Sequence, residues 1–342
     1  MSRPRVAGAA VPSRLADPGR GSLGRPAAPA RPAVSVVVCA FTERRWPDLC
    51  HGLAALDGQT CPPAEVVLVT DHADGLLDRA RRTFRHVRCV PNAGPPGLSA
   101  ARNTGVAAAR GDVVAFIDDD AAPDPDWLER LLAPYADPDV VAVGGTALPA
   151  WPAGRPAWFP AEFDWVVGCS YRGLPTERAE IRNLMGCNMS FRSTVLGTGS
   201  PFRVGVGRVG DRPLGCEETE LCIRIRQHRT WARIMFEPGA TVRHRVTPER
   251  TRLRYFLARC YAEGVSKSLV AGAVGTGDGL RSERGYCART LPRGFAEGIL
   301  AAAHGHPAGL ARSGAILAGL GATVVGYLAA RSGGSRSVAR RR

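Results

Sequence analysis

The sequence predicts an α/β protein with a doubly wound, mostly parallel sheet and a helical C-terminal extension. Its 342 residues, 45 % of them hydrophobic, are enough for one large domain or two modest ones. Between residues 33 and 120, short apolar runs alternate with segments of helical spacing, an order that requires right-handed crossovers. Three Asp, residues 118–120, follow the fourth apolar run, and ligands of such sheets bind beyond the carboxyl ends of the strands.

The strands are predicted from β-branched runs that are apolar at successive positions, as in strands buried on both faces. These runs are Val34–Ala40, Glu65–Val69, Val87–Val90 and Val113–Ile117. The segments between them have helical spacing and are predicted to be helices: Leu49–Leu56, Leu76–Phe84 and Leu98–Ala109. The element order is therefore βαβαβαβ, with acidic residues after the second and fourth strands.

The chain is less regular from about residue 140 to 250. Loops rich in Pro and aromatic residues lead to an acidic block, Glu217–Glu220, and then to a predicted helix, Leu221–Arg226. Apolar residues at helical spacing predict an amphipathic helix over 252–272. The segment 313–330 is uncharged and rich in Gly and Ala, and its 18 residues are at the lower limit for crossing a bilayer. We interpret it as an interfacial or core helix rather than a membrane span.

The net charge of +14 is concentrated at the two ends of the chain. Residues 1–32 hold six Arg and one acid, and residues 331–342 hold five Arg and no acid. We expect a disordered tail over 1–32 and a basic tail over 331–342, either of which could contact an anionic membrane surface. The body between them is only mildly basic and has no motif of a nucleic-acid-binding module, which argues against a nucleic-acid partner.

The cysteine pattern indicates the cellular compartment. The ten Cys are scattered and form no CxxC pair, which argues against metal clusters and redox motifs. The first residues lack the apolar segment of a secretory signal. We therefore expect a cytoplasmic protein, with the inner face of the cell membrane as its possible site of action.

The three carboxylates Asp118, Asp119 and Asp120 are the strongest chemical signal. Adjacent carboxylates repel each other, and crowding them after a buried strand is costly unless a cation or a set of donors offsets the charge. Oxygen ligands of this kind suit Mg²⁺ or Mn²⁺, which usually keep phosphate oxygens as further ligands. A solvated acidic turn is the alternative, but such a turn usually follows an amphipathic strand.

Several spaced motifs resemble those of family 2 glycosyltransferases, which have the GT-A fold. The matching segments are Val34–Thr42, Asp71, Gly97–Gly105, Gly111–Ala121, Gly186–Arg192 and Glu217–Leu221. The segments Trp158–Pro160, Asp164–Cys169 and Arg182-Asn183 resemble in particular the glucosyl-dolichyl-phosphate glucuronosyltransferases. The resemblance covers about residues 33–250, which we take as the glycosyltransferase domain, with 251–330 as a helical extension that could contact a membrane.

The resemblance implies a donor site and a metal site. In the family the first Asp of the acidic motif, here Asp118, contacts the ribose side of a nucleotide-sugar donor. The last one, Asp120, holds a metal ion on the diphosphate, so Asp118, Asp120 and His244 are the implied ligands of Mg²⁺ or Mn²⁺. The positions implied to contact the donor are Cys39, Ala40 and Asp71 at the base, with uridine as the implied base, together with Arg102, Asp119 and Gly186.

The resemblance also implies the reaction. An acceptor hydroxyl is a poor nucleophile and needs a base within hydrogen-bond reach. Glu218 matches the family's base position, and the adjacent Glu217 is the alternative. The implied enzyme is an inverting glycosyltransferase that moves a sugar from a nucleotide-diphosphate donor, with UDP as the implied nucleotide, to a glycan, lipid-linked or small-molecule acceptor. A polyprenyl-phosphate-linked sugar is one such acceptor.

Other classes of protein stay open at this point. A nucleotidyltransferase on a related sheet would carry a Gly-rich loop with Lys or Arg after the first strand, and Cys39–Glu43 lacks it. A glycoside hydrolase would use two carboxylates that flank the scissile bond. A non-catalytic binder of nucleic acid or of an anionic membrane would depend on a basic face and would not need clustered acids.

Overall fold

The computed structural model describes residues 31–197, 199–208 and 214–339. Most of the predicted N-terminal tail, residues 1–30, and the last three residues of the predicted basic tail lie outside the described residues. By its internal contacts the chain from residue 32 onward forms one unit. The predicted domain boundary at residue 250 stays a prediction.

The first half of the sheet is parallel, as the βαβαβαβ order predicts. Its strands are β1 (Val34–Ala40), β2 (Glu65–Thr70), β3 (Arg88–Pro91) and β4 (Val113–Asp118), in the spatial order β3-β2-β1-β4. The helices between them are α1 (Trp46–Asp57), α2 (Asp74–Thr83) and α3 (Leu98–Ala108). Helix α1 begins three residues before its predicted start, because Pro47 is tolerated in a first turn, where its missing N–H costs no hydrogen bond.

The second half of the sheet comes from the region with the weakest sequence signals. Its strands are β5 (Ala121–Pro123), β6 (Val140–Ala150), β7 (Ala179–Glu180), β8 (Asn188–Arg192) and β9 (Arg233–Arg245). Strand β8 lies antiparallel between β4 and β6, and β9 pairs in parallel with β6 and antiparallel with β5 and β7. The sheet is therefore mixed in this half, and the predicted α/β class with a doubly wound sheet is confirmed.

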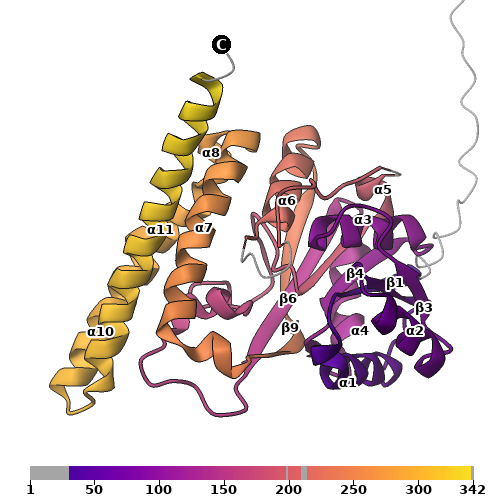
Figure 1. The fold of residues 1–342 in the computed structure, drawn as a ribbon, viewed down its shortest axis with the longest axis horizontal. Helices are drawn as coiled ribbons and strands as arrows, with labels where there is room; N and C mark the ends of the chain where they lie inside the picture. The colour runs from indigo at the N-terminus through magenta and orange to yellow at the C-terminus, as the bar shows by residue number, and fades with distance from the viewer. Residues whose placement is uncertain (1–30, 198, 209–213, 340–342) are drawn as a thin grey trace, which may run out of the picture. The chain divides into compact units, whose positions relative to one another are not determined.

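Short helical elements connect the strands and lead to the C-terminal helices. They are η1 (Glu43–Arg45), α4 (Trp127–Leu132), η2 (Ala133–Ala136), η3 (Ala161–Val167), α5 (Ser193–Leu196), η4 (Pro248–Thr251), α8 (Thr276–Gly279), α9 (Arg281–Gly285) and η5 (Tyr286–Thr290). The longer helix α6 (Glu217–His228) contains the predicted helix Leu221–Arg226 and begins at the acidic block. Figure 1 shows α6 beside the sheet.

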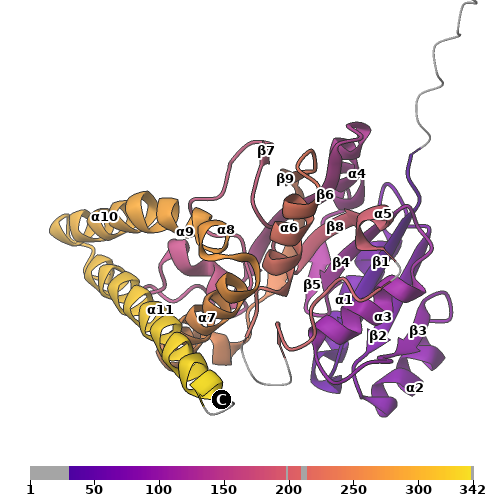
Figure 2. The same cartoon turned by 90° about the horizontal axis from the view of Figure 1, so that it is seen from above.

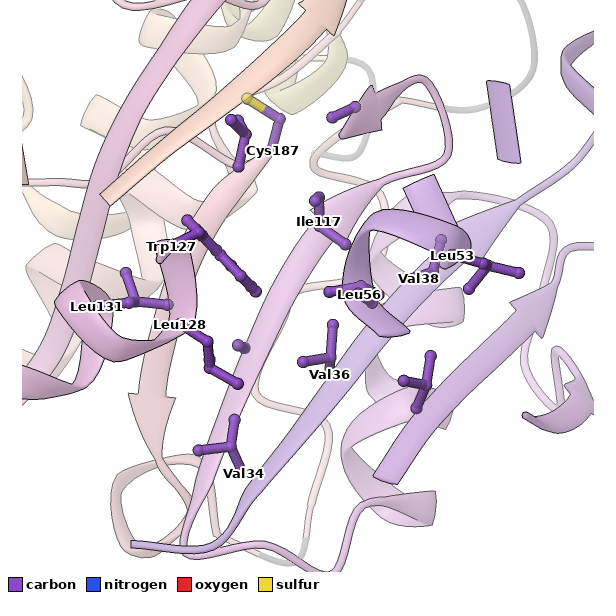
Figure 3. Close-up of a cluster of buried hydrophobic side chains, with 14 of the residues drawn as sticks. Val34, Val36, Val38, Leu53, Leu56, Ile117, Trp127, Leu128, Leu131 and Cys187 are labelled. Atoms are coloured by element: carbon purple, nitrogen blue, oxygen red, sulfur yellow. The ribbon is translucent and has the colours of Figure 1, made fainter. Parts of the chain in front are cut away.

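The core lies on both faces of the sheet, because alternate side chains of a strand point to opposite sides. On one face, Val36 and Val38 of β1 pack in a cluster with α1 and α4 (Figure 3). On the other face, Val37 packs in a cluster with α3 and α6. The indole N–H of the fully buried Trp127 donates a hydrogen bond of 2.8 Å to Asn188 Oδ1, which ties α4 to β8.

Three long helices form the C-terminal part: α7 (Leu253–Val274), α10 (Leu291–Ala303) and α11 (Ala308–Ala339). Helix α11 lies along α7 (Figure 1) and contacts α10 near the turn that joins them, beyond which the two helices diverge (Figure 2). The predicted helix over 313–330 is confirmed but extends further at both ends, through most of the predicted basic tail. The segment Ala308–Ser332 is long and apolar enough to cross a membrane, by length and composition, and 28 % of its most apolar window is buried.

The contact between α7 and α11 depends on glycine. A Cβ at Gly264 would overlap the carbonyl oxygen of Thr323, whereas a Cβ at Gly272 on the same helix would meet no atom within 4 Å. We expect Gly264→Ala to lower the free energy of unfolding by about 1–3 kcal/mol, because the helices must move apart. The matched variant Gly272→Ala is expected to raise it by up to about 1 kcal/mol, through helix propensity alone. Urea unfolding measures both, and equal effects would contradict this account of the packing.

Candidate active site

A pocket lies where the carboxyl ends of β1, β2 and β4 meet. It is lined by ten of the eleven residues that the sequence predicts for the site: Cys39, Ala40, Asp71, Arg102, Asp118, Asp119, Gly186, Glu217, Glu218 and His244. The eleventh, Asp120, is buried directly behind this surface and contacts His244. The structure thus brings together residues that are up to 205 positions apart in the sequence.

Asp118, Asp120 and His244 form a cluster with the donor atoms of a metal site. Strand β9 carries His244 to the acidic turn, because it pairs with β5 directly after that turn. One potential ligand atom from each of the three residues lies within 4.8 Å of the others. His244 Nε2 is 3.1 Å from Asp120 Oδ1 and 3.8 Å from Asp118 Oδ2. Two carboxylates and an imidazole fit a divalent cation such as Mn²⁺ or Mg²⁺.

The electrostatics of the cluster are consistent with a bound cation. Asp120 Oδ1 is buried 3.1 Å from His244 Nε2, and His244 Nδ1 is buried without a hydrogen-bond partner among the described residues. Burial opposes ionisation of Asp120, but the positive charges of His244 and Arg250 hold the pKa of this carboxyl well below its usual range. Burial likewise disfavours the charged form of His244, yet the charge of Asp120 raises the pKa of His244 well above its usual value. Asp120 therefore stays ionised and available as a ligand, whereas His244 holds a proton that it would release on binding a metal ion.

Two arginines that the sequence analysis did not identify surround the acidic turn. Arg45, next to α1, lies 2.6 Å from Asp119 and 3.2 Å from Asp120, and Arg250 of η4 lies 3.3 Å from Asp120. Burial raises the pKa of Asp119 to about 7, although Arg45 opposes this shift. The sequence could not have indicated these arginines, because Arg is abundant throughout the chain and neither one lies near the acidic motif in sequence.

Arg102 of α3 connects three predicted motifs. Its guanidinium donates hydrogen bonds of 2.5 Å to Glu217 and 2.8 Å to the carbonyl oxygen of Gly186, and it lies 3.5 Å from Asp118. A Cβ at Gly186 would come within 3.0 Å of this guanidinium. Glycine at that position therefore allows close contact with Arg102.

The acidic block places two carboxylates in different environments at the start of α6. Glu217 is buried, and its charge is matched by Arg102. Glu218 is half-buried and lines the pocket. Burial and the neighbouring charge of Glu217 raise the pKa of Glu218 to about 7. Of the two residues, Glu218 is thus the one that can exchange a proton with a molecule in the pocket near neutral pH.

The edge of the pocket that is predicted to bind the nucleobase of the donor is held by hydrogen bonds between loops. Asp71 accepts hydrogen bonds of 2.7 Å from Asn92 Nδ2 and 2.8 Å from the backbone N–H of Gly97. Burial raises the pKa of Cys39 to about 12, so its thiol stays neutral. The next residue, His72, has a positive φ of 51°, and its ring lies 3.0 Å from the carbonyl oxygen of Gly94. Asp71 therefore provides the carboxylate on this side of the pocket.

Among the further residues that line the pocket are Trp165, Arg208 and Arg259, of which the two arginines were not predicted. Arg259 is paired with Glu263 at 3.0 Å. Arg208 forms no ion pair within the described ranges, and burial and the positive charge of Arg250 lower its pKa. A half-buried guanidinium that faces a pocket and is repelled by other arginines favours an anion as ligand.

Comparisons with known proteins agree with the motifs. The model of the family described as glycosyl transferase family 2 matches residues 35–199. The glucosyl-dolichyl phosphate glucuronosyltransferase of Haloferax volcanii is 37 % identical over 241 residues, which are 69 % of this chain and 77 % of that protein. The pre-mycofactocin glycosyltransferase of Mycobacterium tuberculosis is 28 % identical over 68 % of this chain and 46 % of its own length.

A solved structure shares the fold. The mannosyltransferase of Pyrobaculum calidifontis, in complex with GDP-Man and Mn²⁺, has a TM-score of 0.52 and 17 % identity. The similarity covers 86 % of this chain and 88 % of that one. It therefore includes a large part of the C-terminal helices as well as the sheet.

Proposed function

The chain belongs to glycosyltransferase family 2, and from this premise we propose that it is an inverting, metal-dependent enzyme that moves a sugar from a UDP-sugar to a hydroxyl of a lipid-linked acceptor. The observation that carries the proposal is one pocket that joins a three-residue metal cluster to a carboxylate with a pKa near neutrality. A basic-surface binder needs neither part, and a nucleotidyltransferase would need the Gly-rich loop that Cys39–Glu43 lacks.

The metal cluster faces the leaving group in this proposal. A divalent cation, Mn²⁺ or Mg²⁺, supplies stabilisation of the negative charge that develops on the diphosphate. Asp118, Asp120 and His244 are the residues that would hold it. Arg45 and Arg250 fix the acidic turn through their ion pairs with it. A preorganised set of charges of this kind lowers the barrier without reorganising during the reaction.

Glu218 is the proposed general base. Its carboxylate takes the proton of the acceptor hydroxyl while the hydroxyl oxygen bonds to the anomeric carbon of the sugar. The bond from that carbon to the diphosphate oxygen breaks on the opposite side, so the configuration inverts. A base with a pKa of about 7 is half-deprotonated at neutral pH and still accepts a proton effectively. Glu217 keeps Arg102 in place and is not the base in this scheme.

The donor is proposed to lie along the strand ends. Cys39, Ala40 and Asp71 would contact the uracil ring, and Arg208 supplies a positive charge for an anionic donor. Glucuronic acid is the first candidate for the transferred sugar, because the relative from Haloferax volcanii is named a glucuronosyltransferase. The mannosyltransferase bound to GDP-Man makes GDP the competing nucleotide.

The acceptor is proposed to be a sugar linked to a polyprenyl phosphate. The name of the same relative includes a glucosyl-dolichyl phosphate, and α11 offers an apolar helix for contact with a membrane. All ten cysteines are free thiols, as expected in the cytoplasm. We place the enzyme at the cytoplasmic face of the membrane.

The test is a nucleotide-release assay with glucose linked to dolichyl phosphate as acceptor. UDP-glucuronic acid, UDP-glucose, GDP-mannose and TDP-glucose are compared, each with Mn²⁺ and with EDTA. We expect acceptor-dependent release of UDP that stops in EDTA. Release that continues in EDTA would contradict the metal site. Release from GDP-mannose alone would replace the proposed nucleotide, and no release from any donor would contradict the proposed reaction.

A further inference from the structure

A second cavity adjoins the active-site pocket. Five residues line both: Trp165, Met185, Cys216, Glu218 and Arg259. The proposed base therefore faces the second cavity as well as the donor pocket. The second cavity continues from Glu218 along the side of the contact between α7 and α11. A molecule in it would have one end next to the carboxylate that must deprotonate the acceptor.

One wall of this cavity is a single face of α11. The lining residues are Leu320, Thr323, Val324, Tyr327 and Leu328, whose spacing of three and four residues places them on one side of a helix. Phe163 and Leu291 add to the apolar lining. The side chains of Val324 and Leu328 are 48 % and 58 % exposed, so the cavity reaches the surface of the helix.

The polar groups of this wall are already engaged. The hydroxyl of Thr323 donates a hydrogen bond of 2.9 Å to the carbonyl oxygen of Gly319, and the hydroxyl of Tyr327 accepts one of 3.2 Å from Arg331. A sugar held along this face would find few partners for its hydroxyls, and burying a hydroxyl without a hydrogen bond is costly. The face is suited to a hydrocarbon.

The opposite wall carries a network of ion pairs. Lys267 lies 3.4 Å from Glu263 and 2.6 Å from Glu283. Arg259 pairs with Glu263 at 3.0 Å, and Arg182 pairs with Glu283 at 2.7 Å. Each acid is thus paired with two cations, and because Lys267 is shared, the wall has three cations for two acids and carries one net positive charge. It can hydrogen-bond the polar head of a molecule whose tail follows α11.

We propose that this cavity holds the first part of the hydrocarbon chain of the acceptor, with the acceptor sugar beside Glu218. The inference rests on the proposed function and adds the path of the lipid. Three observations favour a lipid chain over a soluble acceptor: the cavity is continuous with the active site, the α11 face is apolar, and it ends at exposed apolar side chains on the helix that is apolar enough for a membrane. Burying each CH₂ group of the chain contributes about 0.8 kcal/mol.

Neighbouring residues of α11 provide a matched test. Val324 lines the cavity, whereas Val325 does not, and the two are 48 % and 58 % exposed. Val324→Trp would fill the cavity beside Leu320 and Leu328, and Val325→Trp would place the same side chain outside it. Because both positions are exposed, neither variant is expected to unfold the protein, and thermal melting checks this.

The kinetics are measured with two acceptors in detergent: glucose linked to dolichyl phosphate, and glucose linked to methyl phosphate, which has the same head group but no hydrocarbon chain. We expect Val324→Trp to raise KM for the dolichyl acceptor by about tenfold, the loss of roughly two buried CH₂ groups. Its KM for the donor and its kcat should stay within about twofold of wild type, and its KM for the methyl phosphate acceptor should stay unchanged. Val325→Trp is expected to match wild type with both acceptors.

Each other outcome overturns the inference. If Val324→Trp and Val325→Trp have the same KM for the dolichyl acceptor, the chain does not occupy the cavity. If Val324→Trp raises KM equally for both acceptors, the cavity holds the head group and not the chain. If the wild type transfers sugar to neither acceptor, the proposed function fails and the inference with it, a result that the wild-type assay alone reveals.

Discussion

Asp120→Asn is expected to remove both Mn²⁺ binding and sugar transfer. Asparagine keeps the size of the side chain but removes the negative charge, which lies 3.1 Å from His244 and 3.3 Å from Arg250. Without that charge, Asp118 and His244 are left as an incomplete ligand set beside two arginines. We expect kcat to fall by about 10³-fold, as when a major electrostatic contact of a transition state is lost. The affinity for Mn²⁺ should fall by at least about 100-fold.

Isothermal titration of Mn²⁺ in the presence of UDP measures binding independently of activity. Asp126→Asn is the matched control. Asp126 directly precedes α4, and its solvent-accessible carboxylate pairs at 2.6 Å with Arg130 of that helix. This control should bind Mn²⁺ and turn over like the wild type. Wild-type affinity for Mn²⁺ in Asp120→Asn would show that Asp120 is not a ligand.

Glu218→Gln is expected to abolish turnover while leaving donor binding intact. The amide fills the same space but cannot accept the proton of the acceptor hydroxyl. Loss of a general base typically costs about 10²–10⁴-fold in rate, and we expect kcat to fall within that range. The affinities for UDP and for Mn²⁺ should be unchanged, because Glu218 is not in the metal cluster. A fall in kcat without a change in the dissociation constant of UDP is the expected result.

The pH dependence of kcat/KM tests whether Glu218 or Glu217 is the general base. The base must be deprotonated, so kcat/KM of the wild type should rise with pH and level off above about 7. The negative charge of Glu217 helps to raise the pKa of Glu218. Glu217→Gln should therefore keep a measurable rate, with the rise displaced to lower pH. Loss of activity in Glu217→Gln together with a normal rate in Glu218→Gln would assign the base to Glu217 instead.

The α/β class and the edge of the sheet that carries the site were predictable from the sequence for a local reason. A strand buried on both faces, such as Val34–Ala40, must be apolar at successive positions, and that pattern is visible without any partner. Once four such strands alternate with helices, the chain can only place Asp71 and Asp118 at one edge. The resemblance to the family's motifs then indicated Glu218 and His244. No local sequence pattern places these two residues at that edge of the sheet.

Sequence by itself did not resolve the strands β6, β8 and β9. They lie in a mixed half-sheet, in which the pairing depends on distant partners and not on the pattern of each strand. The pairing of β9 with β5 is what carries His244 to Asp120.

The fold class, the acidic motif proposed to hold a metal and the pair of glutamates proposed to contain the base could all be read from the sequence. Only the tertiary structure distinguished the environments of that pair, because Arg102, 115 residues earlier, neutralises Glu217 and leaves Glu218 facing the pocket. It also added Arg45 and Arg250 to the acidic turn and set α11 against α7. Charge pairing and close packing depend on distances of a few ångströms between residues far apart in the chain, and folding alone sets those distances.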